Sequence, residues 1–117
     1  MSTFPPTARL LTQEDYSGVF NAADLRVSSA AFLVLALFNK EDHSRLGIVV
    51  AKKHVRRAVR RNRLKRLVRE HFRLTPLNRN LDLVVMARAP ADTLPNDSIW
   101  QHLEDLWQKL DIKAAQR

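Results

Sequence analysis

The chain has 117 residues, the size of one domain, and its 20 lysine and arginine residues outnumber 12 aspartate and glutamate residues, which gives a formal net charge of +8. Hydrophobic residues make up 45% of the sequence, enough for one core, which argues against global disorder. Cysteine is absent and glycine occurs twice, which excludes disulfides, thiol nucleophiles and glycine-rich phosphate loops. The start of the sequence lacks the pattern of a secretory signal, and the longest apolar run is too short to cross a bilayer.

Apolar periodicity and turn residues predict six elements in the order α-β-β-α-β-α. In chain order these are a helix over 12–23, a strand over 31–38, a strand over 45–52, a helix over 55–74, a strand over 82–89 and a final helix capped by Asn96 or Asp97. Thr12 and Asp15 have the spacing of a capping box at the start of the first helix. The polar residues 39–44 predict a hairpin turn, which would make the first two strands an antiparallel pair.

Together these elements predict a single α+β domain over 1–117, with an extended arm over 1–8 that holds two prolines and a folded core over 9–110. The segment 25–27 is a candidate for an extra short strand. Gly47 is expected to allow a close approach of strands. In the final helix Trp100 and Trp107 share the apolar face, which is typical of core residues.

The positive charge is concentrated in one segment. Eleven of the 20 lysine and arginine residues lie between Lys52 and Arg73, where Glu70 is the only acid, and the rest of the chain has a net charge of −2. Clustered like charge is self-repulsive, so a polyanion is the natural partner. A solvated helix face does not explain the cluster, because one acid cannot pair with so many bases. Nucleic acid is the first candidate and an anionic membrane surface the second.

At 100° per residue, the helix over 55–74 has an apolar face formed by Leu64, Leu67 and Val68. The opposite face carries Ala58, Asn62, Lys65, Arg66, Arg69 and Arg73, with Arg61 and Arg63 on its two flanks. Guanidinium forks donate two hydrogen bonds to a phosphate, and an asparagine amide can bond a sugar or a base edge. If nucleic acid is the partner, we expect replacement of the Arg61-Asn62-Arg63 motif to weaken its binding without unfolding the domain.

The same residues carry a resemblance. Lys52-Lys53, followed by the run 58–73 with Arg61-Asn62-Arg63 at its centre, closely resembles the signature of the bacterial ribonuclease P protein subunit. The resemblance extends from about Arg9 to Leu110. It implies a small two-layer α/β sandwich of the kind found in a ribosomal protein, with a left-handed βαβ crossover through the basic helix.

The resemblance also implies a function in tRNA processing. Proteins of this family belong to a cytoplasmic ribonucleoprotein that removes the 5′ leader of precursor tRNA. The RNA subunit is the catalyst and holds the Mg²⁺ ions, whereas the protein, one copy per RNA, binds that RNA and the leader. We expect no membrane partner and no metal bound by the protein alone.

The resemblance assigns the contacts to particular residues. Those expected to bind RNA are Arg9, Lys52, Lys53, Arg57, Arg61, Asn62, Arg63, Lys65, Arg66, Arg69 and Arg73. Those expected in a leader cleft between the sheet and the first helix are Tyr16, Phe20, Phe32 and Leu35. On spacing alone, Tyr16 and Phe20 are also typical of a core. The family often has tyrosine at the position of Leu35 and glycine where this chain has Arg56 or Arg57.

The sequence offers no set of residues typical of a nuclease site. The four histidines are scattered and lack the spacing of a metal pair. The acids occur mostly as adjacent pairs that point apart, whereas metal-dependent hydrolysis needs convergent carboxylates. Asp82 is expected to act at the start of its strand. The alternative function is that of a structural RNA-binding protein, ribosomal in type, without a role in cleavage.

Overall fold

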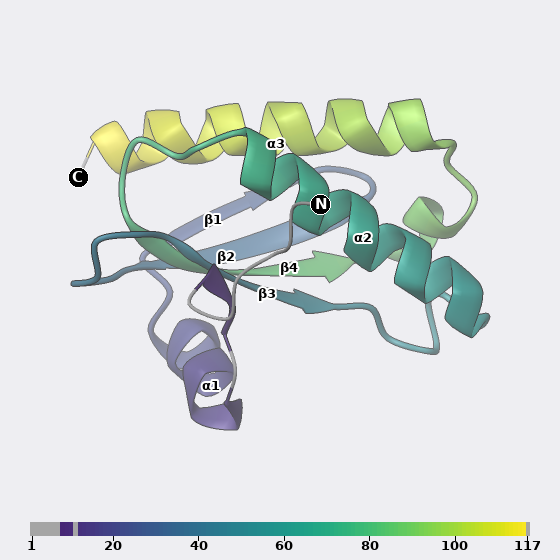
Figure 1. The fold of residues 1–117 in the computed structure, drawn as a ribbon, viewed down its shortest axis with the longest axis horizontal. Helices are drawn as coiled ribbons and strands as arrows, with labels where there is room; N and C mark the ends of the chain where they lie inside the picture. Colours follow the sequence, from purple (N-terminus) through teal and green to yellow (C-terminus); the bar gives the residue numbers. More distant parts are fainter. Residues whose placement is uncertain (1–7, 11, 117) are drawn as a thin grey trace.

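The structure, a computed structural model, describes residues 8–10 and 12–116, so most of the predicted arm lies outside the described residues. Its elements are α1 (Gln13–Ala22), β1 (Leu25–Ser28), β2 (Phe32–Phe38), β3 (Arg45–Val49), α2 (Ala58–Leu74), β4 (Leu81–Ala87), the 3₁₀ helix η2 (Ala89–Asp92) and α3 (Asn96–Ala115). One four-stranded sheet carries α2 and α3 on one face and α1 on the other (Figure 1). The expected α+β class is confirmed, and β1 is the short strand for which 25–27 was a candidate.

The strand order is β1-β2-β4-β3, in which β4 pairs antiparallel with β2 and parallel with β3. The predicted hairpin between the second and third strands is therefore wrong. β2 is paired with β1 on one side and β4 on the other, which leaves no edge of β2 for β3, and β3 instead joins the sheet beyond β4. All of β4 except Met86 is buried, as expected for a central strand.

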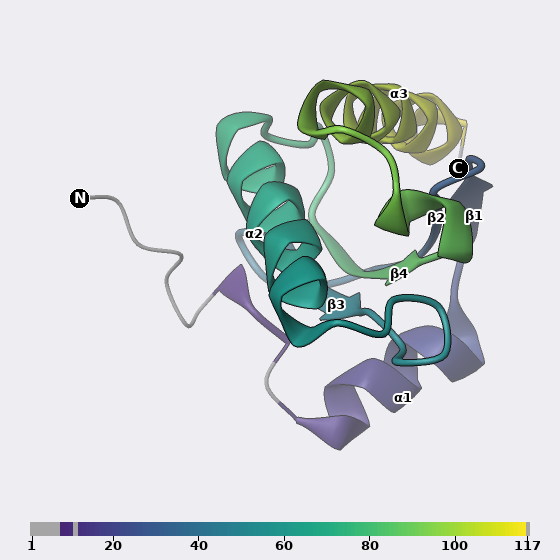
Figure 2. The same cartoon turned by 90° about the vertical axis from the view of Figure 1, so that its right-hand side faces the viewer.

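The parallel strands β3 and β4 are connected through α2, which crosses over one face of the sheet. Figure 2 looks along the strands from their carboxyl ends, with α2 above the sheet, β3 on the left and β4 further right. Viewed from the helix side with both strands pointing up, β4 therefore lies to the left of β3. The crossover is left-handed, against the usual preference and in agreement with the family resemblance.

The two faces of the sheet bury separate apolar clusters. Between the sheet and the α2–α3 layer lies the larger cluster, which contains Phe32 and Val34 of β2. A smaller cluster beneath α1 is built on Val19 and includes Leu35 and Leu37 of β2. Successive residues of a strand point to opposite faces, so β2 divides its side chains between the two layers.

α2 begins at Ala58, three residues later than predicted. Before the helix, the amide of Val55 donates to the carbonyl of Ala51 at 3.0 Å in a turn. The Val55 side chain is fully buried in the larger cluster. Because this residue closes the turn and fills the core, the chain becomes helical only after it.

α3 begins directly after Pro95, which is the N-cap residue, so the predicted caps Asn96 and Asp97 are wrong. The Asp97 carboxylate accepts from the amide of Ser98 at 2.9 Å, inside the first turn. The predicted apolar face is confirmed for Ile99, Leu103, Leu106, Trp107 and Leu110, which are buried. Trp100 is half-buried, with its ring 4.4 Å from that of His71 on α2.

Candidate nucleic-acid interface

α2 has one apolar face and one cationic face. Leu64 and Val68 are fully buried, and Leu67 is partly buried against the same cluster. The opposite face carries Ala58, Asn62, Lys65, Arg66, Arg69 and Arg73, all exposed except the half-buried Lys65. The rotation of the helix predicted from the sequence is confirmed.

The two arginines on the flanks of this face bind main-chain carbonyl groups. Nη1 of Arg61 donates to the carbonyls of Val55 and Arg56, at 3.1 and 2.7 Å. The guanidinium of Arg63 donates to three acceptors in the segment that joins β4 to α3. Arg61 and Arg63 thus lie on the flanks of the cationic face, as predicted. Because their contacts link α2 to neighbouring segments, we expect that removing either side chain lowers the stability of the fold in addition to removing a positive charge.

Arg73, at the end of the cationic face, is paired within its own helix. Its guanidinium donates to the carboxylate of Glu70. This hydrogen bond lowers the pKa of Glu70 and raises that of Arg73, each relative to its ordinary value. Since Glu70 is the only acid in the basic segment, its charge offsets Arg73 and leaves the rest of the face unneutralised.

Among the cationic side chains predicted to bind RNA, six remain available for a ligand, and we refer to them together as the cationic surface. They are Lys52, Lys53 and Arg57 before α2, and Lys65, Arg66 and Arg69 on it. Each is exposed apart from Lys65, and none makes a side-chain hydrogen bond or ion pair with another described residue. The arrangement suits a ligand that brings several negative charges.

A pocket of about 210 Å³ lies at the outer edge of β3, between α1 and α2. It is lined by Arg9, Leu10, Tyr16, Leu46, Ile48, Lys65 and Arg69. The N-terminal segment reaches it because the amide of Leu10 donates to the carbonyl of Leu46 at 3.0 Å. Arg9, Lys65 and Arg69, which come from two distant parts of the sequence, thus share one cavity with Tyr16, and none of the described residues that line it is an acid.

Tyr16 approaches the sheet at a glycine. A Cβ atom at Gly47 would lie 2.6 Å from Cε1 and 2.8 Å from Cζ of the tyrosine ring, closer than real Cβ contacts come. The sequence predicted a close approach at Gly47, but the group that approaches is this ring rather than another strand. The Tyr16 ring therefore occupies the space that a side chain at position 47 of β3 would fill.

The predicted leader-cleft residues fall into two groups. Tyr16 and Leu35 pack in the same cluster beneath α1, and Phe20 on α1 is 43% exposed. Phe32 is 1% exposed and belongs to the cluster on the opposite face of the sheet. Its assignment to the cleft is wrong, because residues 32 and 35 of one strand point to opposite faces. Sequence reasoning missed Leu10 and Ile48, which line the pocket beside Tyr16.

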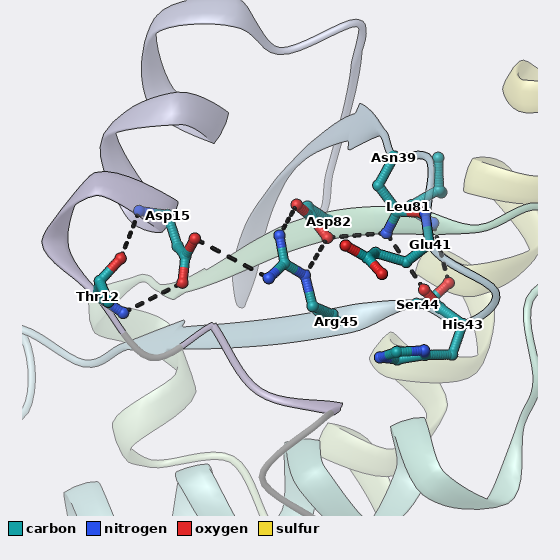
Figure 3. A network of polar contacts seen from close by, with 9 residues as sticks. All are labelled: Thr12, Asp15, Asn39, Glu41, His43, Ser44, Arg45, Leu81 and Asp82. Atoms are coloured by element: carbon teal, nitrogen blue, oxygen red, sulfur yellow. Dashed lines mark hydrogen bonds and ion pairs between the residues drawn. The ribbon is translucent and has the colours of Figure 1, made fainter.

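A partly buried ion pair between β3 and β4 ties α1 to the sheet (Figure 3). Asp82 accepts from Nε and Nη2 of Arg45 at 2.8 and 2.5 Å, and from the side-chain Nδ2 of Asn39 at 2.8 Å. Arg45 also lies 3.9 Å from a carboxylate oxygen of Asp15, which closes the capping box of α1 with Thr12. The hydrogen bond that Arg45 donates to Asp82 raises the pKa of Arg45. Asp82 therefore has the structural role at its strand that was expected.

Comparisons with known proteins identify the family. The family model described as Ribonuclease P matches residues 4–111. The ribonuclease P protein component of Marinobacter nauticus is 46% identical over 114 residues, which cover 97% of this chain and 86% of that protein. The chain belongs to the ribonuclease P protein family.

Other ribonuclease P proteins agree in sequence and fold. The protein component of Acinetobacter baylyi is 45% identical over 96% of this chain and 86% of its own length. The solved ribonuclease P protein of Staphylococcus aureus superposes with a TM-score of 0.81 at 32% identity, covering 88% of this chain and 94% of that one. The ribonuclease P protein of Thermotoga maritima superposes with a TM-score of 0.77 at 33% identity, covering 86% of this chain and 96% of that one. The basic helix and the Tyr16 pocket both lie within the matched residues 4–111.

Two further properties of this ribonuclease P protein come from the described part of the chain. Among the described residues, there is no group of three or more histidine, aspartate or glutamate side chains that could hold a metal ion. None of the described helices is long and apolar enough to span a membrane.

Proposed function

We propose that this ribonuclease P protein binds two RNAs: the catalytic RNA subunit and the 5′ leader of precursor tRNA. The observation that carries the proposal is the pocket in which Tyr16 of α1 meets Lys65 and Arg69 of α2. It joins an aromatic ring to the cationic surface, and single-stranded RNA is bound by this combination of stacking and backbone neutralisation.

The cationic surface is suited to the RNA subunit. Its arginines present planar forks that match phosphate oxygens, and its lysines contribute point charges. Asn62 lies between them on the exposed face of α2, where its amide can donate to and accept from a base edge or a 2′-hydroxyl. The first turn of α2 contains no acid, so the positive end of the helix adds to the attraction for phosphate.

The leader is proposed to lie along α1 and enter the pocket at the edge of β3. One base would stack on Tyr16, while neighbouring phosphates contact Lys65 and Arg69. Phe20, which is exposed on the same helix, offers a second ring. Leu35 contributes apolar contact where the family often has tyrosine, so stacking at that position is replaced by packing.

Hydrolysis of the phosphodiester bond is proposed to take place on the RNA subunit, with Mg²⁺ bound by that RNA and one protein per RNA. The protein's part is to hold the leader and so distinguish precursor from product.

The direct test is reconstitution. Purified protein is added to separately transcribed ribonuclease P RNA, and cleavage of precursor tRNA is followed at a Mg²⁺ concentration too low for the RNA alone. The proposal predicts accurate release of the 5′ leader only when both components are present. A structural RNA-binding protein of ribosomal type would bind the RNA without restoring cleavage.

A further inference from the structure

The first two turns of α2, which carry the Arg61-Asn62-Arg63 motif, lack the usual supports of a helix start. The N-cap residue Arg57 makes no side-chain capping bond to the described residues, and Leu64 is the first buried residue of the helix. Val59, the apolar residue of the first turn, is 73% exposed. The arginines here also place positive charge at the positive end of the helix dipole, which is unfavourable. Something other than capping or apolar packing must hold these turns.

Arg61 and Arg63 make side-chain contacts that hold them. Arg61 bonds the carbonyls of Val55 and Arg56 just before the helix, whereas Arg63 ties the turns to a distant part of the chain. Its Nη1 donates to Oδ1 of Asn96 at 2.6 Å, and its Nη2 donates to the carbonyls of Leu94 and Ala91 at 3.1 and 3.4 Å. These three acceptors belong to the connection that leads from η2 into the first residue of α3, and Ala91 is fully buried. Both terminal nitrogens of the guanidinium are thereby engaged with protein acceptors.

A neighbouring ion pair also links the first turns of α2 to the β4–α3 connection. Nη1 of Arg60 lies 3.3 Å from a carboxylate oxygen of Asp92, in the same connection. That pair is more exposed and is expected to contribute little by itself. By contrast, the side chains of Arg66 and Arg69, one turn or more further on, make no hydrogen bond or ion pair with the described residues. The arginines of one helix therefore divide into bound and available groups.

We infer that Arg63 is a positioning residue: it fixes the first two turns of α2 against the β4–α3 connection, and so presents Asn62 and the cationic surface, without itself contacting phosphate. The part of this inference that concerns RNA rests on the proposed function. A phosphate that bound Arg63 through both terminal nitrogens would compete with the carbonyls of Ala91 and Leu94 for the two hydrogens of Nη2, and a carbonyl that loses its partner on burial carries a desolvation cost.

Salt dependence separates a phosphate contact from a positioning role. Each neutralised phosphate contributes about 0.7–0.9 to the slope of log affinity against log salt concentration. Arg63→Gln and the matched control Arg66→Gln each remove one positive charge from the same helix. Binding to ribonuclease P RNA is measured for both at several salt concentrations, and urea unfolding is measured without RNA.

We expect Arg66→Gln to reduce the steepness of the salt slope by about 0.7–0.9 and to leave the urea midpoint unchanged. We expect Arg63→Gln to weaken binding with the wild-type slope and to lower the urea midpoint. If Arg63→Gln does not fold, Arg63→Lys replaces it: the charge is kept but the fork is lost, and the midpoint should still fall.

An unchanged urea midpoint for the Arg63 variants would overturn the inference. A slope reduced as much by Arg63→Gln as by Arg66→Gln would overturn it as well, since Arg63 would then be a phosphate ligand. If neither variant changes the slope, the proposed RNA surface is wrong, whereas a lowered midpoint of the Arg63 variants alone would still support its positioning of α2.

Discussion

His71 on α2 and Trp107 on α3 share a hydrogen bond in the interior, in which the indole Nε1 donates to Nδ1 of the imidazole at 2.9 Å. Both side chains are 1% exposed. The indole can only donate, so Nδ1 must be the acceptor and the proton of the neutral ring must be on Nε2. Nε2 lies 3.2 Å from a carboxylate oxygen of Glu104, close enough for an ion pair but without hydrogen-bond geometry. The two helices above the sheet are thus joined by a histidine held in one tautomer.

This arrangement predicts a loss of stability in mild acid. Burial lowers the pKa of His71, with the charge of Glu104 opposing the shift, so the folded protein takes up the proton less readily than the unfolded chain. Neutral His71 therefore stabilises the fold fully at pH values above the pKa of histidine in the unfolded chain, about 6.5. This stabilisation declines as the pH falls below that pKa. Urea unfolding at pH 7.5 and 5.5 measures the decline. His71→Gln, which keeps an acceptor for Trp107 but does not titrate, should show a smaller difference between the two pH values. If His71→Gln loses as much stability between pH 7.5 and pH 5.5 as the wild type does, titratable groups other than His71 cause the loss.

A second prediction concerns the glycine beneath Tyr16. Gly47→Ala should lower the free energy of unfolding by about 1–3 kcal/mol, because the new methyl group overlaps the tyrosine ring. The matched control is Gly18→Ala on α1, where a Cβ meets no described atom within 4 Å. That change should raise stability by about 0.5–1 kcal/mol, as expected for alanine in a helix. Equal effects of the two substitutions in urea unfolding would contradict the tight contact.

The part of the fold that local sequence patterns specify was predictable. The capping box of Thr12 and Asp15, the rotation of α2 and the apolar face of α3 all follow from spacing that one segment contains. Strand pairing was not predictable in this way, because β3 joins the sheet beyond a strand that begins about thirty residues later. The wrong assignment of Phe32 to the leader cleft has the same origin: which face of the sheet Phe32 points to depends on how β2 pairs with β1 and β4, and β4 is distant from β2 in the sequence.

The site shows a similar division. The charge of the cationic surface can be counted from the sequence, but the bonds of individual arginines cannot. Arg63 finds its acceptors 28 to 33 residues away along the chain, and no local pattern indicates them. The sequence predicted that Leu64, Leu67 and Val68 share the apolar face of α2 but not how deeply each is buried. Leu64 is fully buried and Leu67 only partly, so Leu64→Ala should destabilise the protein more than Leu67→Ala.

A third prediction is a strong salt dependence of binding to ribonuclease P RNA. If the six side chains of the cationic surface each neutralise about one phosphate, the slope of log affinity against log salt concentration should be roughly −4 to −5. Affinities measured between about 50 and 200 mM monovalent salt, at fixed Mg²⁺, give this slope. A slope near zero would exclude α2 and the segment before it as the main contact.

The most direct measurement of the central claim compares precursor and mature tRNA as ligands of the assembled enzyme. Stacking of one base on one ring contributes about 1–3 kcal/mol, so Tyr16→Ala should weaken precursor binding about tenfold to a hundredfold. Mature tRNA, which has no leader, should bind as it does to the wild type, and Tyr16→Phe should retain most of the affinity for the precursor. An equal loss for both tRNAs would mean that Tyr16 supports the fold or the contact with the RNA subunit, and would contradict its assignment to the leader.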